Sequence, residues 1–310
     1  MKNKYVFAAA AAVMAIATPI ALSAQAPAAP QQIDVGAVLK SLKPQHGHIA
    51  LPAAKASLDL GNQYDFYGPE DARKILVDLW GNPPDGVSNV LGMVMKAGAS
   101  PAKDNWGAVV TYEASGYVSD DDANTTDYAA VLKQMQDGET EENDQRKSAG
   151  YPTIHVAGWA ENPTYDKASH SMVWARDIKF SDGTVDSLNY DVRSLGRAGV
   201  LSLNLVSTMP HLADVKTAAH EFAGHAGFDA GARYADFNPD LDKKAEYGVG
   251  GLVAAGAGLV IAKKLGLLAI FGKFFISFLK PILVGIAAMF AAFKNRIMGL
   301  FGRKTDELEG

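Results

Sequence analysis

The chain of 310 residues contains no cysteine. Thiol catalysis, cysteine-ligated zinc, iron–sulfur clusters and disulfide bonds are therefore excluded. A chain without cysteine is compatible with an oxidising compartment. Clusters of basic residues are also scarce, because the net charge is −5 and no long run of Lys and Arg occurs in the middle of the chain. Since binding to a phosphate backbone needs clustered basic side chains, we expect no nucleic-acid partner.

Motifs for a nucleophilic serine or a bound nucleotide are absent as well. The sequence contains no GxSxG, no GxGxxG and no phosphate-binding GKS or GKT. Two histidines, His220 and His225, flank Glu221 and resemble a metalloprotease helix at first sight. They stand at i and i+5, whereas zinc ligands on one helix face stand at i and i+4. We therefore expect no metal, no cofactor and no catalytic residue, and the pattern favours a protein that is not an enzyme.

The first 26 residues have the layout of a secretory signal peptide. Two lysines precede an alanine-rich apolar run, and Ala24-Gln25-Ala26 offers small residues at the spacing that cleavage needs. Pro27 directly after this site would hinder the cut, so cleavage after Ala24 and an uncleaved anchor helix stay open as alternatives. Residues 27–45 begin with a Pro/Ala-rich stretch and are expected to form a linker.

A long apolar segment near the C-terminus predicts a membrane anchor. We expect residues 245–293 to form it as helix, since no acidic residue occurs from Tyr247 to Phe293. Residues 274–293 are the best candidate for the span, because about 20 apolar residues cross a hydrocarbon core. The stretch 248–272 contains a lysine pair and is expected to lie at the membrane interface. A hairpin of two crossings is the alternative. The glycines at the start of the stretch 248–272 are expected to allow close helix packing.

Charged residues beside the predicted span suggest a partner and an orientation. Lys273 and Lys280 stand seven residues apart and share one helix face, where carboxylates of a membrane-protein partner could neutralise them. Residues 294–310 form a charged tail whose Lys and Arg favour the cytoplasmic side. One crossing then places the chain in the bacterial inner membrane, with its main domain in the periplasm and the lipid bilayer as a partner.

The middle of the chain, residues 46–244, is expected to form one α+β domain. Three consecutive runs alternate between apolar and polar residues, which predicts an antiparallel sheet with one solvent-exposed face and a few helices packed on the other. The alternating runs are 172–180, 188–193 and 201–205. Further strands are expected over 106–112 and 153–159, and helices over 69–80, 126–146 and 211–222.

The polar residues of these runs supply one candidate site for a ligand or partner. Asn189, Asp191 and Arg193 lie on the predicted solvent-exposed face of one strand, and Arg197 lies just beyond it. Arg193 and Arg197 could each bind a carboxylate or phosphate through two hydrogen bonds. The alternative is a network of charges between strands that binds nothing.

Three sequence blocks carry a family resemblance. They are WGNPP (80–84), GWAENPTYD (158–166) and LNYDVRSLGRAGVL (188–201). With these blocks the chain resembles the bacterial domain-of-unknown-function family numbered 2167, over nearly the whole mature chain. The family is described only as predicted membrane-anchored, so the resemblance implies an exported, anchored protein. It implies no reaction, cofactor or site residue.

Three hypotheses about function follow. The first is a non-enzymatic envelope protein whose periplasmic domain binds a partner or a ligand. The second is a periplasmic hydrolase or transferase that uses dispersed carboxylates such as Asp166, Asp191 or Asp236, which would have to meet in one pocket. The third is an accessory subunit of an inner-membrane complex, joined to its partner through Lys273 and Lys280.

Overall fold

The computed structural model describes residues 33–82, 84–103, 105–148 and 152–256. The predicted signal peptide, the span at 274–293, the charged tail and the lysines at 273 and 280 lie outside these residues. Of the helices that the structure describes, none is long and apolar enough to cross a membrane. The described fold belongs to one unit that begins at Val35.

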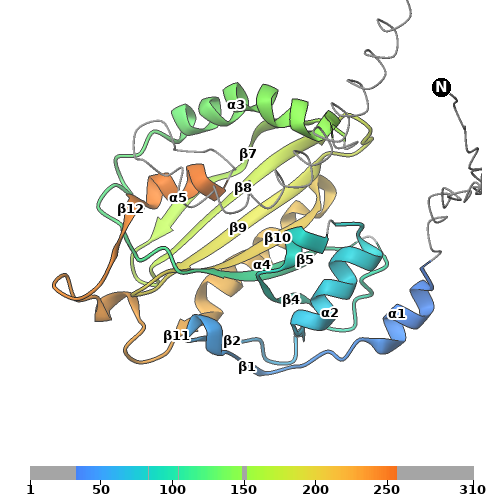
Figure 1. Ribbon diagram of the computed structural model, residues 1–310, viewed down its shortest axis with the longest axis horizontal. Helices are drawn as coiled ribbons and strands as arrows, with labels where there is room; N and C mark the ends of the chain where they lie inside the picture. The colour runs from blue at the N-terminus through green and yellow to red at the C-terminus, as the bar shows by residue number, and fades with distance from the viewer. Residues whose placement is uncertain (1–32, 83, 104, 149–151, 257–310) are drawn as a thin grey trace, which may run out of the picture. The chain divides into compact units, whose positions relative to one another are not determined.

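An antiparallel sheet of seven strands forms the centre of this unit (Figure 1). The strand order is β3-β4-β5-β10-β9-β8-β7, which confirms both the α+β class and the predicted meander of three consecutive strands. The strands are β3 (Tyr64–Tyr67), β4 (Val90–Lys96), β5 (Gly107–Glu113), β7 (Ile154–Asp166), β8 (Ser171–Phe180), β9 (Ser187–Leu195) and β10 (Val200–Thr208).

Helices and two small sheets complete the described fold. The α-helices are α1 (Val35–Ser41), α2 (Pro69–Lys74), α3 (Tyr128–Ser148), α4 (Leu212–His225) and α5 (Val249–Gly256). A π-helical turn, η2 (Ile75–Leu79), extends α2. One small sheet is antiparallel, with β1 (His48–Leu51), β2 (Ala56–Asp59) and β11 (Ala226–Phe228); the other pairs β6 (Tyr117–Ser119) with β12 (Lys244–Gly248) in parallel. The fold thus continues past Lys244, where the sequence predicts its end.

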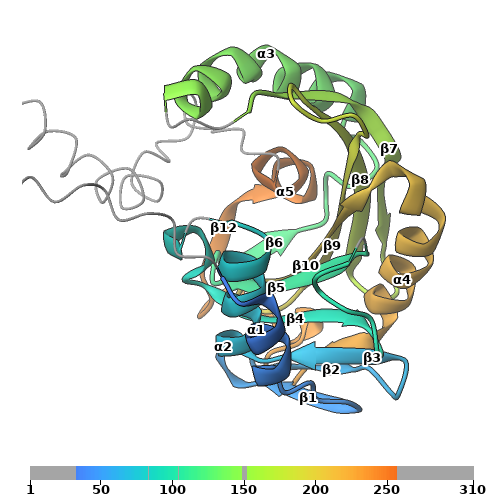
Figure 2. The same ribbon diagram turned by 90° about the vertical axis from the view of Figure 1, so that its right-hand side faces the viewer.

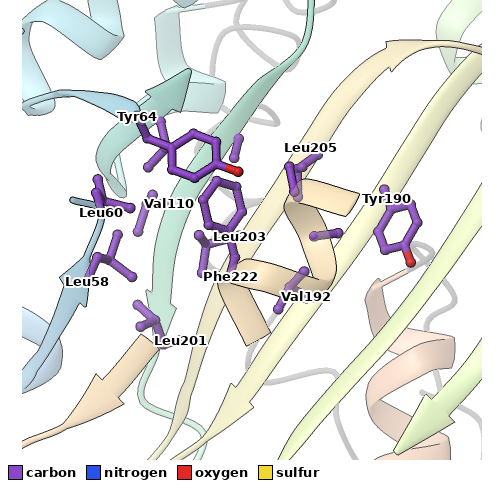
Figure 3. Packing of buried hydrophobic residues seen from close by; sticks show 14 of the residues in the cluster. Leu58, Leu60, Tyr64, Val110, Tyr190, Val192, Leu201, Leu203, Leu205 and Phe222 are labelled. Atoms are coloured by element: carbon purple, nitrogen blue, oxygen red, sulfur yellow. The ribbon is translucent and has the colours of Figure 1, made fainter. Parts of the chain in front are cut away.

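One face of the seven-stranded sheet carries the main hydrophobic core. Alternate residues of β9 and β10 point to this face, where they pack against α4 and the small sheet of β1, β2 and β11. Phe222 of α4 is completely buried, and its ring centroid lies 4.8 Å from that of Tyr64. Figure 3 shows Phe222 among the side chains of Tyr64, Val110 and Leu203. The apolar half of the predicted alternation is therefore confirmed.

The opposite face of the sheet is covered too. Figure 2 shows α4 on one side of the sheet and α5 on the other. Trp174 packs there in one hydrophobic cluster with residues of α3 and α5, and Met93 packs in another cluster with residues of α2 and η2. Asp191, expected on a solvent-exposed face, has an exposed fraction of 0%. The expectation of a solvent-exposed face is wrong at Asp191. Helices α3 and α5 cover one part of this face, and α2 with η2 covers another.

Helix α3 also protects the edge strand β7. An unpaired strand edge would offer its backbone groups to another chain. Four polar side chains, one helical turn apart, bind the backbone of β7 and the residues before it: Gln136 to Val156 O (2.9 Å), Glu139 to Val156 N (2.6 Å), Asn143 to both Ile154 N and Ile154 O (2.8 Å each) and Arg146 to Pro152 O (2.7 Å). They take the place of a neighbouring strand.

Replacing Asn143 with alanine should loosen this edge. The change removes two hydrogen bonds to Ile154, and this loss outweighs the higher helix propensity of alanine. We therefore expect the free energy of unfolding to fall by about 1–3 kcal/mol. Urea unfolding measures the loss, and hydrogen exchange should be faster at the Ile154 amide. Glu142→Ala, at an exposed neighbouring position of α3, is the control. Equal stability of the two variants would show that α3 does not hold the edge.

Candidate functional site

Polar side chains from three neighbouring strands meet at the centre of the face that α2, α3 and α5 surround. Cross-strand pairing brings Met93, Val109, Asn204, Asp191 and Trp174 into one row, with the polar pair between apolar residues. The next rows on the same face add further polar residues from β8, β9 and β10. The central polar cluster, as we call it, consists of Arg176, Asn189, Asp191, Arg193, Ser202 and Asn204.

Asp191 is the only acid of this cluster and binds both of its arginines. Its Oδ1 lies 2.6 Å from Nη2 of Arg193, and its Oδ2 lies 3.4 Å from Nη2 of Arg176. Asn204 Nδ2 donates a third hydrogen bond to Asp191 Oδ1, at 3.0 Å. The arginine side chains are only 10% (Arg176) and 15% (Arg193) exposed. The carboxylate is therefore desolvated but paired, as a buried charge must be.

Neutral groups fix the two guanidinium groups from the other side. Arg176 Nη2 donates to Asn189 Oδ1 at 2.8 Å, and Arg193 Nη1 donates to Ser202 Oγ. Asn189 and Asn204 donate to each other through their side-chain amides, at 3.2 and 2.8 Å. The structure thus brings together three of the four predicted site residues, Asn189, Asp191 and Arg193, in a network between strands.

The fourth predicted site residue, Arg197, belongs to a different contact. Its Nε and Nη2 bind the carboxylate of Asp242 at 2.7 and 3.0 Å, and its Nη1 donates to Gly231 O at 3.2 Å. The hydrogen bond from Arg197 is the first cause that lowers the pKa of Asp242, and the backbone N–H of Asn238 adds to it. Arg197 therefore ties the β9–β10 turn to the segment that precedes β12.

The three carboxylates of the hydrolase hypothesis lie in three separate hydrogen-bond networks. Asp166 accepts from Ala168 N and Ser169 Oγ in the turn after β7, and Asp236 accepts from two backbone N–H groups before it. Asp191 belongs to the central polar cluster. Within the described part of the chain, no group of three or more His, Cys, Asp or Glu residues is arranged to hold a metal ion.

A second polar network lies on the other face of the sheet, beside α4. Its centre is Glu161 of β7, whose carboxylate accepts from Tyr190 Oη at 2.7 Å and contacts Lys216 Nζ and His220 Nε2 at 3.0 Å each. The side chains of Lys216 and His220 are about half exposed, at 53% and 49%. Sequence reasoning missed this network. The sequence pattern that could indicate this network is the i, i+4 spacing of Lys216 and His220 on the predicted helix.

Titration of this second network follows from its contacts. Burial alone would raise the pKa of Glu161, but the hydrogen bonds from Tyr190, Lys216 and His220 together outweigh burial and lower it. Burial, followed by the hydrogen bond to Glu161, raises the pKa of Tyr190. Glu161 is thus held as an ionised carboxylate that two half-exposed cationic or protonatable side chains approach.

Comparison with known proteins decides the family. A family model described as a protein of unknown function, DUF2167, matches residues 43–289. This chain belongs to the DUF2167 family. The matched range of this DUF2167 chain includes every residue of the central polar cluster and of the Glu161 network.

Other comparisons add little. No protein of curated function matches this DUF2167 chain significantly. Among solved structures, the solution structure of cyanobacterial PsbP (CyanoP) from Synechocystis sp. PCC 6803 is similar, with 10% sequence identity and a TM-score of 0.33. That similarity covers 61% of this chain and 92% of the PsbP chain.

Removing the acid of the central polar cluster should destabilise the DUF2167 domain strongly. Asp191→Asn leaves two mostly buried guanidinium groups without a carboxylate, and breaking a buried ion pair in this way costs about 3–5 kcal/mol. Urea unfolding measures the loss. Asp240→Asn, at an exposed position, should change stability by no more than about 0.5 kcal/mol. A loss of the same small size for Asp191→Asn would contradict the central role of this carboxylate.

Glu161→Gln should make stability depend less on pH. Because the pKa of Glu161 is lowered in the folded state, its ionised form stabilises the fold above the unfolded-state pKa of about 4.3. This contribution is lost as the pH falls through the lower, folded-state pKa. The variant should thus be less stable than the wild type near neutral pH, and the difference should shrink below pH ~4. Urea midpoints across this range measure it, with exposed Glu142→Gln as the control.

Proposed function

We propose that this chain is a membrane-tethered binding protein of the bacterial cell envelope. Its folded domain lies in the periplasm and recognises a ligand or partner through the central polar cluster. The observation that carries the tethering half of this proposal is the position of α5. This helix belongs to the folded domain, and the long apolar run of the sequence begins within it and continues beyond Gly256.

Helix α5 is packed as a core element. Val249 and Val253 have an exposed fraction of 0%, and that of Leu252 is 2%. They share a hydrophobic cluster with residues of α3 and with Trp174 of β8. Strand β12, directly before α5, pairs with β6 and so fixes the entry of the helix.

The glycines at the start of α5 allow this packing, as the sequence predicts. A Cβ atom on Gly250 would lie 2.3 Å from Thr126 Oγ1, and one on Gly248 would lie 2.4 Å from Asp122 Oδ1. Asp122 Oδ2 accepts a hydrogen bond from Gly250 N at 3.1 Å, at the positive end of the helix dipole. Only glycine permits this close approach of the helix to the loop before α3.

The state of the acidic residues supports binding over catalysis. Asp166 and Asp236 each accept hydrogen bonds that shape a turn, and Asp191 neutralises arginines. A general acid or base needs a carboxylate that can reach a substrate. The hydrolase hypothesis receives no support from this arrangement. The accessory-subunit hypothesis rests on Lys273 and Lys280 and stays a prediction.

Fractionation of cells that express three chain lengths tests the tether. The full chain should remain in the membrane pellet after washing with alkaline carbonate, which strips peripheral proteins. A chain that ends at Gly256 keeps α5 and should appear in the periplasmic extract instead. A chain that ends at Phe293 lacks only the charged tail and should stay in the pellet, because the apolar segment is complete. Release of the full chain by osmotic shock alone would refute the tether.

A further inference from the structure

The central polar cluster contains more positive than negative charge. Two guanidinium groups face one carboxylate, and the other three members, Asn189, Ser202 and Asn204, are neutral. Among the residues that the structure describes, Arg176 and Arg193 form ion pairs with Asp191 alone. One positive charge is therefore left over in a site whose charged side chains are at least 85% removed from solvent. An unbalanced buried charge is costly unless a counter-charge joins it.

Hydrogen-bond donors are also in excess at the same place. Arg176 Nε, Arg193 Nε and Trp174 Nε1 are buried, and the described structure offers them no acceptor. Trp174 and Arg176 point to one face of β8, and the Arg193 guanidinium lies 5.5 Å from the centroid of the Trp174 ring. All three unpartnered atoms are N–H donors. Native proteins leave few such groups unpaired, so the site lacks an acceptor.

A water molecule would not meet both deficits. A water oxygen can accept hydrogen bonds, but it brings no negative charge. The nearby acid Glu113 accepts a hydrogen bond from Tyr247, and neither it nor Asp166, Asp236 or Asp242 forms an ion pair with Arg176 or Arg193 among the described residues. An anion rich in oxygen atoms would supply both the negative charge and the acceptors.

We propose that the central polar cluster binds one singly charged oxyanion group, of the kind that a phosphodiester or a carboxylate presents. This inference rests on the binding half of the proposed function and names the class of its ligand. Guanidinium groups bind such oxygens in pairs of parallel hydrogen bonds. Arg176 and Arg193 keep 10% and 15% of their side-chain surface, so a group in solution can reach the exposed part of each side chain, whereas the Nε atoms are buried. Asp191 at the base holds both guanidinium groups in place.

Arg176→Gln separates this proposal from a purely structural network. Arg176 makes the longer of the two contacts with Asp191, at 3.4 Å compared with 2.6 Å for Arg193. The variant removes the surplus charge and leaves a neutral Asp191–Arg193 pair. It should lose at least about tenfold in oxyanion affinity while the unliganded protein unfolds at an unchanged or higher temperature. If the cluster were only structural, the variant would unfold at a lower temperature.

Thermal unfolding of the purified full chain in a mild non-ionic detergent measures both effects. The probes are inorganic phosphate, acetate and glycerophosphoglycerol (a soluble phosphodiester), each against potassium chloride of equal ionic strength. A ligand that binds only the folded state raises the unfolding temperature with its concentration. A preference for glycerophosphoglycerol would indicate phosphodiester groups such as lipid headgroups, and a preference for acetate would indicate carboxylates.

Arg197→Gln serves as the matched control. It removes an arginine that is bound to Asp242 outside the cluster, so it should lower stability and leave the response to the probes unchanged. The proposal is overturned if none of the three probes stabilises the wild type beyond chloride at about 10 mM. It is also overturned if Arg176→Gln responds to them like the wild type. These assays take place in detergent, so their failure is separate from any failure of the membrane tether.

Discussion

The pairing of Asp191 with two arginines is the constraint around which the covered face of the sheet is arranged. A carboxylate with no exposed surface requires cationic partners, and neighbouring strand positions supply them as Arg176 and Arg193. Apolar side chains then fill the margins of the same face, with Met93 towards α2 and Trp174 towards α3 and α5. The face therefore has a charged centre and apolar margins, and the helices pack on these margins.

The two polar networks differ in how they balance charge. Glu161 meets a lysine and a histidine whose side chains are half exposed, so water screens whatever charge remains. The central polar cluster has little contact with water, and its surplus charge is screened far less. Of these two networks, and within the described residues, the central cluster alone combines that surplus with buried donors that have no acceptor. For this reason we propose the ligand at the central polar cluster and not at Lys216 and His220 beside α4.

The sequence predicts the strands well because alternation reports which residues share a face. Leu201, Leu203 and Leu205 point to one core, as their spacing requires. Alternation does not report what covers the polar face, and so the sequence alone predicts Asp191 in solvent. The helix that covers it, α5, lies within an apolar run whose composition indicates a membrane segment. Contacts such as that of Glu161 with His220 join residues far apart in the chain, and no local pattern contains them.

Helix α5 and the central polar cluster are linked through Trp174. Arg193 stacks over Trp174, and Trp174 shares its hydrophobic cluster with Val249 and Val253 of α5. Loosening α5 would expose the Trp174 ring and weaken the surface on which the Arg193 guanidinium rests. An anion that fixes Arg193 would in turn favour the packed position of α5, because coupling between two sites is reciprocal. The start of the apolar C-terminal run thus belongs to the same hydrophobic cluster as the ring over which Arg193 lies, so a change in the packing of α5 reaches the central polar cluster through Trp174.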